Sequence, residues 1–243
     1  MVKKIPAKWE KPPTILSEVS ENLSEFPPVI RQILYTRGFD NAQSARQFLN
    51  ASITLEDPFL LLDMDKAVTR IQKAIDQKEQ IAVYGDFDVD GVTATALLIE
   101  VLHGLGAKVV PYIPDRIDEG YGLNFNSLQK LFEQGIRLII TVDCGIRSVK
   151  EVEFIQSKGV DIIVTDHHYP KDIPPAYAII CQKRDGDMYP NKNLAGVGLA
   201  YKLANALLLQ FDDLTFKVEN WLDLVALGTV ADNVPLTGEN RIL

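Results

Sequence analysis

The sequence contains few cysteines, few histidines and no long hydrophobic run. No charge-free stretch of about twenty apolar residues occurs, which argues against a membrane span. The N-terminus, Met1-Val-Lys-Lys-Ile-Pro, has no apolar stretch behind its lysines and does not read as a signal peptide. Cys144 and Cys181 have no metal-binding spacing, so we expect both to be reduced, mostly buried residues of a cytoplasmic protein.

Other absences narrow the chemistry. No G-x-x-x-x-G-K-S/T loop is present, which disfavours nucleotide hydrolysis by that route. Gly196-Val197-Gly198 is too short a glycine signal for nucleotide binding, and we interpret it as allowing close helix packing. The net charge of −8 argues against a protein that simply coats DNA. It does not exclude a nuclease, because carboxylates that hold two divalent cations lose about four negative charges on loading.

The 243 residues, 47% of them apolar, are enough for a substantial core. Residues 1–78 read as a proline-interrupted arm followed by helices, which we predict at 28–37, 42–49 and 63–77. From residue 79 strands alternate with helices, a pattern that predicts an α/β fold with a parallel sheet of approximately five strands flanked by helices. The strands are predicted at 81–84, 108–112, 138–142, 161–165 and 178–180. The helices are predicted at 92–105, 126–134, 148–158, 194–209 and 216–227.

Three of these strands end in polar residues that an apolar core would not retain. The first leads into Gly85-Asp-Phe-Asp-Val-Asp-Gly91, the third into Asp143-Cys-Gly145, and the fourth into Asp166-His-His168. Ligands of open parallel sheets bind beyond the carboxyl ends of the strands. The three clusters are therefore expected to point into one crevice.

The first cluster has two alternative interpretations. Its aspartates begin like an EF-hand loop, but Leu97 stands where that loop needs glutamate, and a strand precedes it, so the EF-hand is excluded. The run from Asp88 to Val92 also resembles the nucleophile loop of haloacid-dehalogenase phosphatases. In those loops the apolar strand runs straight into the first aspartate, whereas Gly85 and Asp86 intervene here. That reading stays open as a minor alternative.

The histidines strengthen the metal interpretation. Of three in the chain, His167 and His168 are adjacent at a strand end, whereas His103 lies inside a predicted helix. Carboxylates packed together without a metal would repel one another and shift each other's pKa values. Oxygen ligands with one or two imidazoles suit Mn²⁺ well and Mg²⁺ less well. Two such ions about 4 Å apart would clamp a phosphodiester and activate a water.

The motifs occur in an order that is similar to a known family. They are Gly85–Gly91, Glu119-Gly-Tyr-Gly122, Val142-Asp-Cys-Gly145, Asp166-His-His168 and Gly228-Thr-Val-Ala-Asp232-x-x-Pro235. The chain resembles the DHH phosphoesterase superfamily and, within it, the RecJ-type single-strand-specific exonucleases. The resemblance implies a DHH domain over residues 79–243. It also implies hydrolysis of single-stranded DNA from the 5′ end with two Mn²⁺ or Mg²⁺ ions, in DNA repair or recombination.

The resemblance also implies residue roles. It implies metal ligation by Asp88, Asp90, Asp143, His167 and Asp232, with Asp143 bridging, and Asp86 as a further ligand or supporting group. His168 would hold the scissile phosphate or stabilise transition-state charge. Arg116 and Tyr121 would contact the DNA backbone, with a salt bridge from Arg116 to Asp118 or Glu119 as the alternative. Single-stranded-DNA-binding protein or a helicase are the implied protein partners, and no membrane is expected.

Two departures from the family pattern bear on these expectations. Tyr84 stands where several DHH families carry a histidine ligand. The chain ends at Leu243, so a DHHA1-type second domain and an OB-type module are expected to lie outside it. The alternatives are another DHH phosphodiesterase, acting on oligoribonucleotides, cyclic dinucleotides or pyrophosphate, and a non-catalytic scaffold relative.

Overall fold

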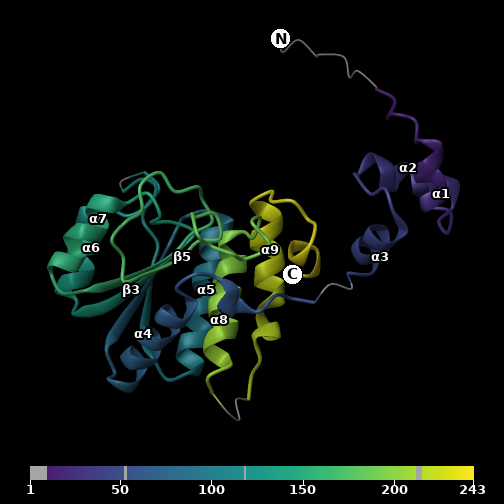
Figure 1. Ribbon diagram of the computed structural model, residues 1–243. Coiled ribbons are helices and arrows are strands. Elements are labelled where there is room, and N and C mark those ends of the chain that lie inside the picture. Colours follow the sequence, from purple (N-terminus) through teal and green to yellow (C-terminus); the bar gives the residue numbers. More distant parts are fainter. Residues whose placement is uncertain (1–9, 52–53, 118, 212–214) are drawn as a thin grey trace, which may run out of the picture. The chain divides into compact units, whose positions relative to one another are not determined.

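The computed structural model describes residues 10–51, 54–117, 119–211 and 215–243. The chain divides into two compact units, Met1–Thr54 and Leu55–Arg241 (Figure 1). The first unit is helical and the second contains the sheet. Within the described residues, no helix is both long enough and apolar enough to cross a membrane.

The helices of the first unit follow from local signals. Pro28 occupies the first turn of its helix, where its missing N–H costs nothing, and the Asn41 side chain accepts a hydrogen bond from the Ser44 N–H at 2.9 Å. A small core of Leu23, Leu34 and Ala45 joins the helices. Two of the three were predicted to within one residue; the short α1 was not. The helices are α1 (Ser17–Asn22), α2 (Pro28–Thr36) and α3 (Ala42–Asn50).

The second unit is built on a five-stranded parallel sheet with the order β2-β1-β3-β4-β5. The predicted α/β fold class is confirmed, and all five strands lie where they were expected, with β1 and β3 extended by one or two residues at their ends. The strands are β1 (Gln80–Gly85), β2 (Lys108–Tyr112), β3 (Ile136–Val142), β4 (Asp161–Thr165) and β5 (Ala178–Ile180).

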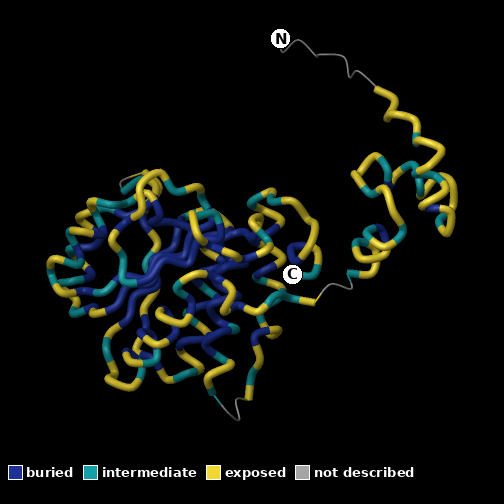
Figure 2. The backbone as a smooth tube through the Cα atoms, in the orientation of Figure 1, coloured by how far each residue is buried: buried dark blue, intermediate teal, exposed yellow. Residues whose placement is uncertain are grey.

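Side chains alternate between two apolar layers, one on each face of the sheet. Ile81 and Val83 of β1 join the core beneath the first helix layer, whereas Ala82 and Tyr84 join the core beneath the second. In Figure 2 the strands form a continuous buried band between the layers. The first layer contains α4 (Met64–Asp76), α5 (Val89–Gly104), α8 (Gly196–Leu208) and α9 (Leu222–Ala231), and the second contains α6 (Phe125–Glu133) and α7 (Val149–Ser157).

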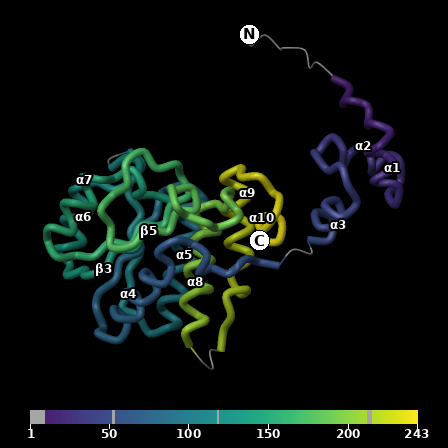
Figure 3. Tube along the Cα trace, viewed as in Figure 1, coloured from purple at the N-terminus to yellow at the C-terminus, as the bar shows by residue number. Residues whose placement is uncertain are grey.

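Helix boundaries depart from prediction where capping or tertiary contacts decide them. Helix α5 begins at Val89, three residues early, because the Asp88 side chain caps it by accepting the Gly91 N–H at 2.9 Å. The segment predicted as one helix at 216–227 is instead the 3₁₀ turn η2 (Val218–Trp221) followed by α9. Two further short elements, η1 (Pro58–Leu60) and α10 (Glu239–Ile242), were not predicted (Figure 3).

A buried ion pair fastens the C-terminal segment to the sheet unit. Lys202 of α8 is fully buried, and its Nζ donates to a Glu239 carboxylate oxygen and to the Glu56 carbonyl oxygen. The Tyr189 hydroxyl donates to the other Glu239 oxygen at 2.7 Å, and the Glu56 N–H donates to the first at 2.8 Å. The pair therefore joins α8 and α10 to the start of this unit.

Candidate metal centre

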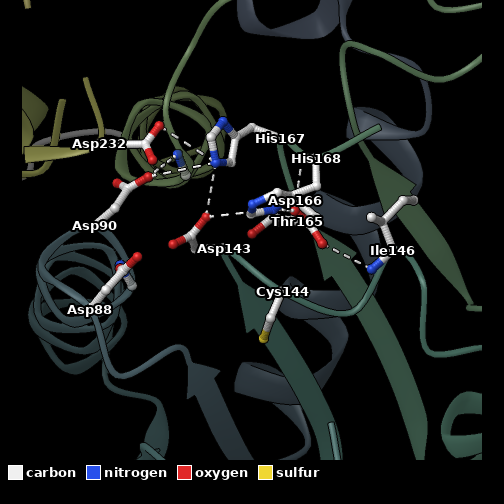
Figure 4. Close-up of polar contacts among 12 residues, drawn as sticks. Asp88, Asp90, Asp143, Cys144, Ile146, Thr165, Asp166, His167, His168 and Asp232 are labelled. Atoms are coloured by element: carbon white, nitrogen blue, oxygen red, sulfur yellow. Dashed lines mark hydrogen bonds and ion pairs between the residues drawn. The ribbon is translucent and has the colours of Figure 1, made fainter. Parts of the chain in front are cut away.

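Carboxylates and imidazoles from three neighbouring strand ends meet at one edge of the sheet (Figure 4). Strands β1, β3 and β4 are adjacent and parallel, so the loops that follow them share this edge. The His167 Nε2 atom lies 3.1 Å from Asp143 Oδ1 and 3.9 Å from Asp90 Oδ2. The predicted convergence of the three clusters is confirmed.

Asp90 lies in the first turn of α5, where the backbone of a second helix holds it. Its two carboxylate oxygens accept hydrogen bonds from the N–H groups of Gly196, at 2.6 Å, and Val197, at 2.7 Å. These are the first two residues of α8, where unpaired amides and the helix dipole favour an anion. The carboxylate is thus fixed in orientation although its side chain is almost fully buried.

Gly196 has a second role that its sequence context did not reveal. A Cβ at this position would lie 2.6 Å from Asp143 Cβ and 2.8 Å from its Oδ1. A Cβ on Gly198 would meet the Leu194 side chain at 3.3 Å, a tight contact that a shift of a few tenths of an ångström would relieve. The packing interpretation of this glycine pair therefore describes Gly198, while Gly196 belongs to the metal centre. The sequence shows only that Gly196 stands at the start of an apolar helix, which does not indicate its contact with Asp143.

Asp143 follows β3 in a strained backbone conformation. Its φ of 62° lies in the left-handed region, which costs a residue other than glycine about 1–3 kcal/mol. The Asp143 N–H donates to the Thr165 carbonyl oxygen at 3.0 Å and so holds the turn against β4. The buried carboxylate then faces both histidines, with Oδ1 4.0 Å from His168 Nδ1. Strain of this kind is typical of functional sites.

His167 faces three carboxylates. Besides Asp143 and Asp90, its Nε2 lies 3.7 Å from Asp232 Oδ2, and neither ring nitrogen has a hydrogen-bond partner among the described residues. Burial, together with the neighbouring His168, lowers the pKa of His167, so the imidazole is neutral and can offer a lone pair. Asp232 reaches the site as the C-terminal cap of α9, which no strand-end pattern could indicate.

Asp86 and Asp88 complete the cluster on the β1 side. Asp86 is buried, with its Oδ1 lacking a partner among the described residues, and burial raises its pKa. Asp88 is exposed and uses one oxygen as the cap of α5. Ligand atoms of Asp86, Asp88 and Asp143 all lie within 4.8 Å of one another.

The cationic groups near the crowded carboxylates, His168 and Lys183, only partly offset the repulsion. Burial, followed by mutual repulsion, raises the pKa values of Asp90 and Asp143, although the two α8 amides oppose the shift at Asp90. Burial and the charge of Asp88 likewise raise the pKa of Asp232. A cation bound among these oxygens would remove the repulsion.

The donor set fits divalent cations. Three overlapping groups of ligand atoms are present: Asp143 with His167 and His168; Asp90 with His167 and Asp232; and Asp86 with Asp88 and Asp143. Buried atoms without hydrogen bonds, among them Asp143 Oδ1 and His167 Nε2, face the centre. Carboxylate oxygens with one or two imidazoles suit Mn²⁺ and Mg²⁺. Asp143 and His167 each belong to two groups, which is the arrangement expected of two neighbouring ions.

Asp166 orients His168. Its Oδ1 lies 2.7 Å from His168 Nδ1 and also accepts the His168 N–H at 3.0 Å, while its Oδ2 accepts the Ile146 N–H at 2.9 Å. The hydrogen bond to Asp166 raises the pKa of His168. Burial works against ionisation of Asp166, but the hydrogen bonds from His168 and Ile146 outweigh it and lower the pKa of this carboxyl. Asp166 was visible in the sequence motif, yet its orienting role was not predicted.

Tyr121 lies over the centre, and Arg116 lies near it. The Tyr121 hydroxyl donates to the Asp143 carbonyl oxygen at 3.3 Å and is 3.5 Å from His168 Nε2, the ring nitrogen that Asp166 leaves available. The Arg116 guanidinium lies 5.3 Å from the ring centroid of Phe87, in the first motif. Of the two predicted salt-bridge partners of Arg116, Asp118 lies outside the described residues. The other, Glu119, accepts hydrogen bonds from the Tyr112 hydroxyl and the Asp115 N–H.

Tyr84 does not join the centre. Its side chain is fully buried on the α6 face of the sheet, where its hydroxyl donates to the Gly122 carbonyl oxygen at 3.1 Å and accepts from the Asn124 amide at 3.2 Å. The departure noted at this position is therefore a structural hydrogen bond that holds the loop after β2.

A parallel α/β unit with carboxylates and imidazoles at its strand ends defines a class of protein that is built to bind divalent cations at that edge. The chain belongs to the DHH family: the model of its N-terminal domain matches residues 80–229. Membership of the DHH family excludes the haloacid-dehalogenase alternative.

Curated relatives and solved structures agree with the family match. The single-stranded-DNA-specific exonuclease RecJ of Bacillus subtilis is 47% identical over 89% of this chain and 27% of its own length, and that of Escherichia coli is 39% identical over 94% and 41%. The chain thus spans well under half of these relatives. A crystal structure of exonuclease RecJ bound to manganese aligns with a TM-score of 0.68 at 38% identity, covering 75% of this chain and 46% of that one. RecJ of Thermus thermophilus with Mn²⁺ aligns with 0.72 at 32%, covering 92% and 31%.

Proposed function

We propose that this chain is the catalytic core of a two-metal-dependent exonuclease that hydrolyses single-stranded DNA in the 5′ to 3′ direction. The observation that carries the proposal is the overlap of three ligand groups at Asp143 and His167. The names of the curated relatives support the substrate and the reaction. The polarity of cleavage comes from the resemblance of the motifs.

The metal ligands in this proposal are Asp86, Asp88, Asp90, Asp143, His167 and Asp232, with Asp143 shared between two ions. Mn²⁺ or Mg²⁺ bound there would lower the pKa of a water and stabilise the leaving oxygen of a phosphodiester. The relatives crystallised with manganese and with Mg²⁺ support this choice of ion.

The chain's own groups would position the substrate phosphate. His168 is proposed to hold the scissile phosphate and stabilise charge in the transition state, because the hydrogen bond to Asp166 raises the pKa of the imidazole, which favours its protonated form, and fixes the ring. Tyr121 would contact the same phosphate through its hydroxyl, 3.5 Å from His168 Nε2. Arg116 would contact the DNA backbone.

The wider setting is part of the same proposal. The catalytic domain would comprise residues 79–243, preceded by an arm and helical segment at 1–78, and the family match over 80–229 supports that boundary. A role in DNA repair or recombination, with single-stranded-DNA-binding protein or a helicase as partner, would follow from the substrate. The cytoplasm is the proposed compartment, supported by two buried cysteines that form no disulfide.

The test is cleavage of 5′-labelled single-stranded DNA by the purified chain with and without Mn²⁺. We expect mononucleotides that depend on Mn²⁺, at least a ~100-fold loss of rate in Asp143→Ala, and little cleavage of duplex DNA or of RNA. Asp76→Ala is the matched control, an exposed carboxylate at the end of α4. Undiminished cleavage by Asp143→Ala would contradict the assignment. Preferred cleavage of RNA would contradict the substrate.

A further inference from the structure

A groove of about 520 Å³ lies beside the metal centre, within the size range of ligand sites. It is lined by the loop that follows the second histidine of the centre and by the loop that follows β5. Tyr169 and Lys171 come from the first loop, and Lys183 and Arg184 come from the second. None of these residues is a proposed ligand of the centre described above.

The groove is locally basic in an acidic chain. Three of its lining residues carry positive charge and one, Asp185, carries negative charge, whereas the whole chain has a net charge of −8. Arg184 is largely buried and bound to Asp63 at 3.0 Å, so it forms part of the wall. The positive charges that remain to meet a ligand are those of Lys171 and Lys183, beside the exposed carboxylate of Asp185.

An exposed aromatic ring, that of Tyr169, also lines the groove. Tyr169 exposes 69% of its surface, and Lys183 Nζ lies 4.9 Å from its ring centroid. Arg147 Nε donates to the Tyr169 carbonyl oxygen at 3.0 Å and so holds the backbone that carries the ring. Aromatic rings beside cations are the usual means of holding single-stranded nucleic acid, because bases stack on the ring and phosphates meet the cations.

The groove adjoins the metal centre. Tyr169 directly follows His168 in the chain, and Cys181, two residues before Lys183, donates its Sγ–H to the His168 carbonyl oxygen at 3.5 Å. A strand whose phosphate sits at the centre would therefore place a neighbouring nucleotide over Tyr169.

We propose that this groove is a nucleotide subsite for single-stranded DNA, in which Tyr169 stacks on a base and Lys171 and Lys183 contact the flanking phosphates. The subsite rests on the nuclease function proposed above. It adds to that function a binding site next to the reacting phosphate that accepts any base. Stacking on a single ring does not read base identity, which suits an enzyme that degrades any sequence.

The experiment measures binding of labelled oligothymidylate to the full chain by fluorescence anisotropy at several salt concentrations. Ca²⁺ replaces Mn²⁺, under conditions in which no cleavage is detected. We expect Tyr169→Ala to raise Kd about tenfold and Tyr169→Phe to bind like the unsubstituted chain. Lys171→Gln and Lys183→Gln should each lower the slope of log K against log salt by about 0.7.

Lys158→Gln is the matched control, because Lys158 also lies 4.9 Å from an aromatic ring, that of Phe154, at the end of α7. It should change neither Kd nor the slope. In Mn²⁺, Tyr169→Ala should raise KM and leave kcat within about twofold, as expected when binding is lost without loss of transition-state contacts.

The subsite is overturned if Tyr169→Ala binds as tightly as the unsubstituted chain, if Tyr169→Phe is as weak as Tyr169→Ala, or if the unsubstituted chain does not bind the oligonucleotide. Cleavage that depends on Asp143 but not on the groove residues would remove the subsite alone. Binding that depends on Tyr169, without cleavage that depends on Asp143, would remove the nuclease function and leave a DNA-binding groove.

Discussion

His168 and Asp166 show how one carboxylate decides the charge of its neighbour. Asp166 accepts hydrogen bonds from both the ring and the backbone of His168, and a further one from Ile146. The hydrogen bond to Asp166 thereby favours the protonated form of the His168 imidazole, whereas burial favours the neutral form of His167, whose ring centroid lies 4.5 Å away. The two adjacent histidines can therefore do different chemistry. His168 can stabilise negative charge, whereas His167 can offer a lone pair to a metal ion.

Asp166→Asn tests this division. Without the carboxylate, the pKa of His168 falls, so the ring loses its proton at lower pH. We expect the alkaline limb of kcat against pH to move to lower pH and the rate at pH 8 to fall by about 100-fold or more. In a His168→Asn background the same change should cause no further shift. A pH profile that is unchanged in Asp166→Asn would contradict the role of Asp166.

At the scale of elements, the N-terminus of α8 positions carboxylates of the metal centre. Its first amides hold Asp90, and the absence of a side chain on Gly196 leaves room for Asp143. Two carboxylates, that of Asp90 in α5 and that of Asp143 after β3, thus depend on the position of one helix end. Gly198, two residues later, faces Leu194 and provides a comparison within the same helix.

Gly196→Ala should displace Asp143, because the new Cβ would lie 2.6 Å from the Asp143 Cβ. We expect a loss of unfolding free energy of about 1–3 kcal/mol and a loss of Mn²⁺ affinity measurable by calorimetry. Gly198→Ala, with its contact at 3.3 Å, should keep the Mn²⁺ affinity. Equal Mn²⁺ affinities in the two variants would show that Gly196 has no special role in the centre.

At the scale of the whole molecule, the net charge of −8 is partly concentrated at one edge of one sheet. Asp86, Asp90, Asp143 and Asp232 all have raised pKa values in the folded chain, mainly because of burial. Their carboxyls in the unfolded chain titrate near pH 4. At these four carboxyls the metal-free folded state therefore binds more protons than the unfolded state at intermediate pH.

It follows that the stability contributed by these carboxyls is complete below about pH 4 and is lost as the pH rises through their raised folded values. We expect the melting temperature of the chain in EDTA to fall between pH 5 and 8 by several degrees, at ~2–4 °C for each kcal/mol. Excess Mn²⁺ should stabilise more at pH 8 than at pH 5.5. Calorimetry should show a flatter pH dependence in Asp143→Asn, and an equally steep one would refute the account.

Most of the sheet could be predicted from the sequence, because its strands are short apolar runs, three of which end in polar residues. Those same ends gave the carboxylates and histidines of three strands. The short helices were missed, since tertiary contacts such as those of Glu239 decide them and local propensity does not. Asp232 came only from the family resemblance, because it caps a helix. Gly196 could not be found, because its meaning depends on Asp143, more than fifty residues away in the sequence.

The Lys202–Glu239 pair has a consequence for how the chain is made. Glu56 and Glu239 are 183 residues apart, and both bind the ammonium of Lys202. Lys202 leaves the ribosome 37 residues before Glu239, a delay of roughly 2–7 s at ordinary rates of synthesis. Until Glu239 has been synthesised, burial of the Lys202 ammonium would leave its charge unpaired. We therefore expect α8 to pack against the sheet unit only after Glu239 is present. The amides that orient Asp90 belong to α8, so we expect the metal centre to be completed only after Glu239 has been translated.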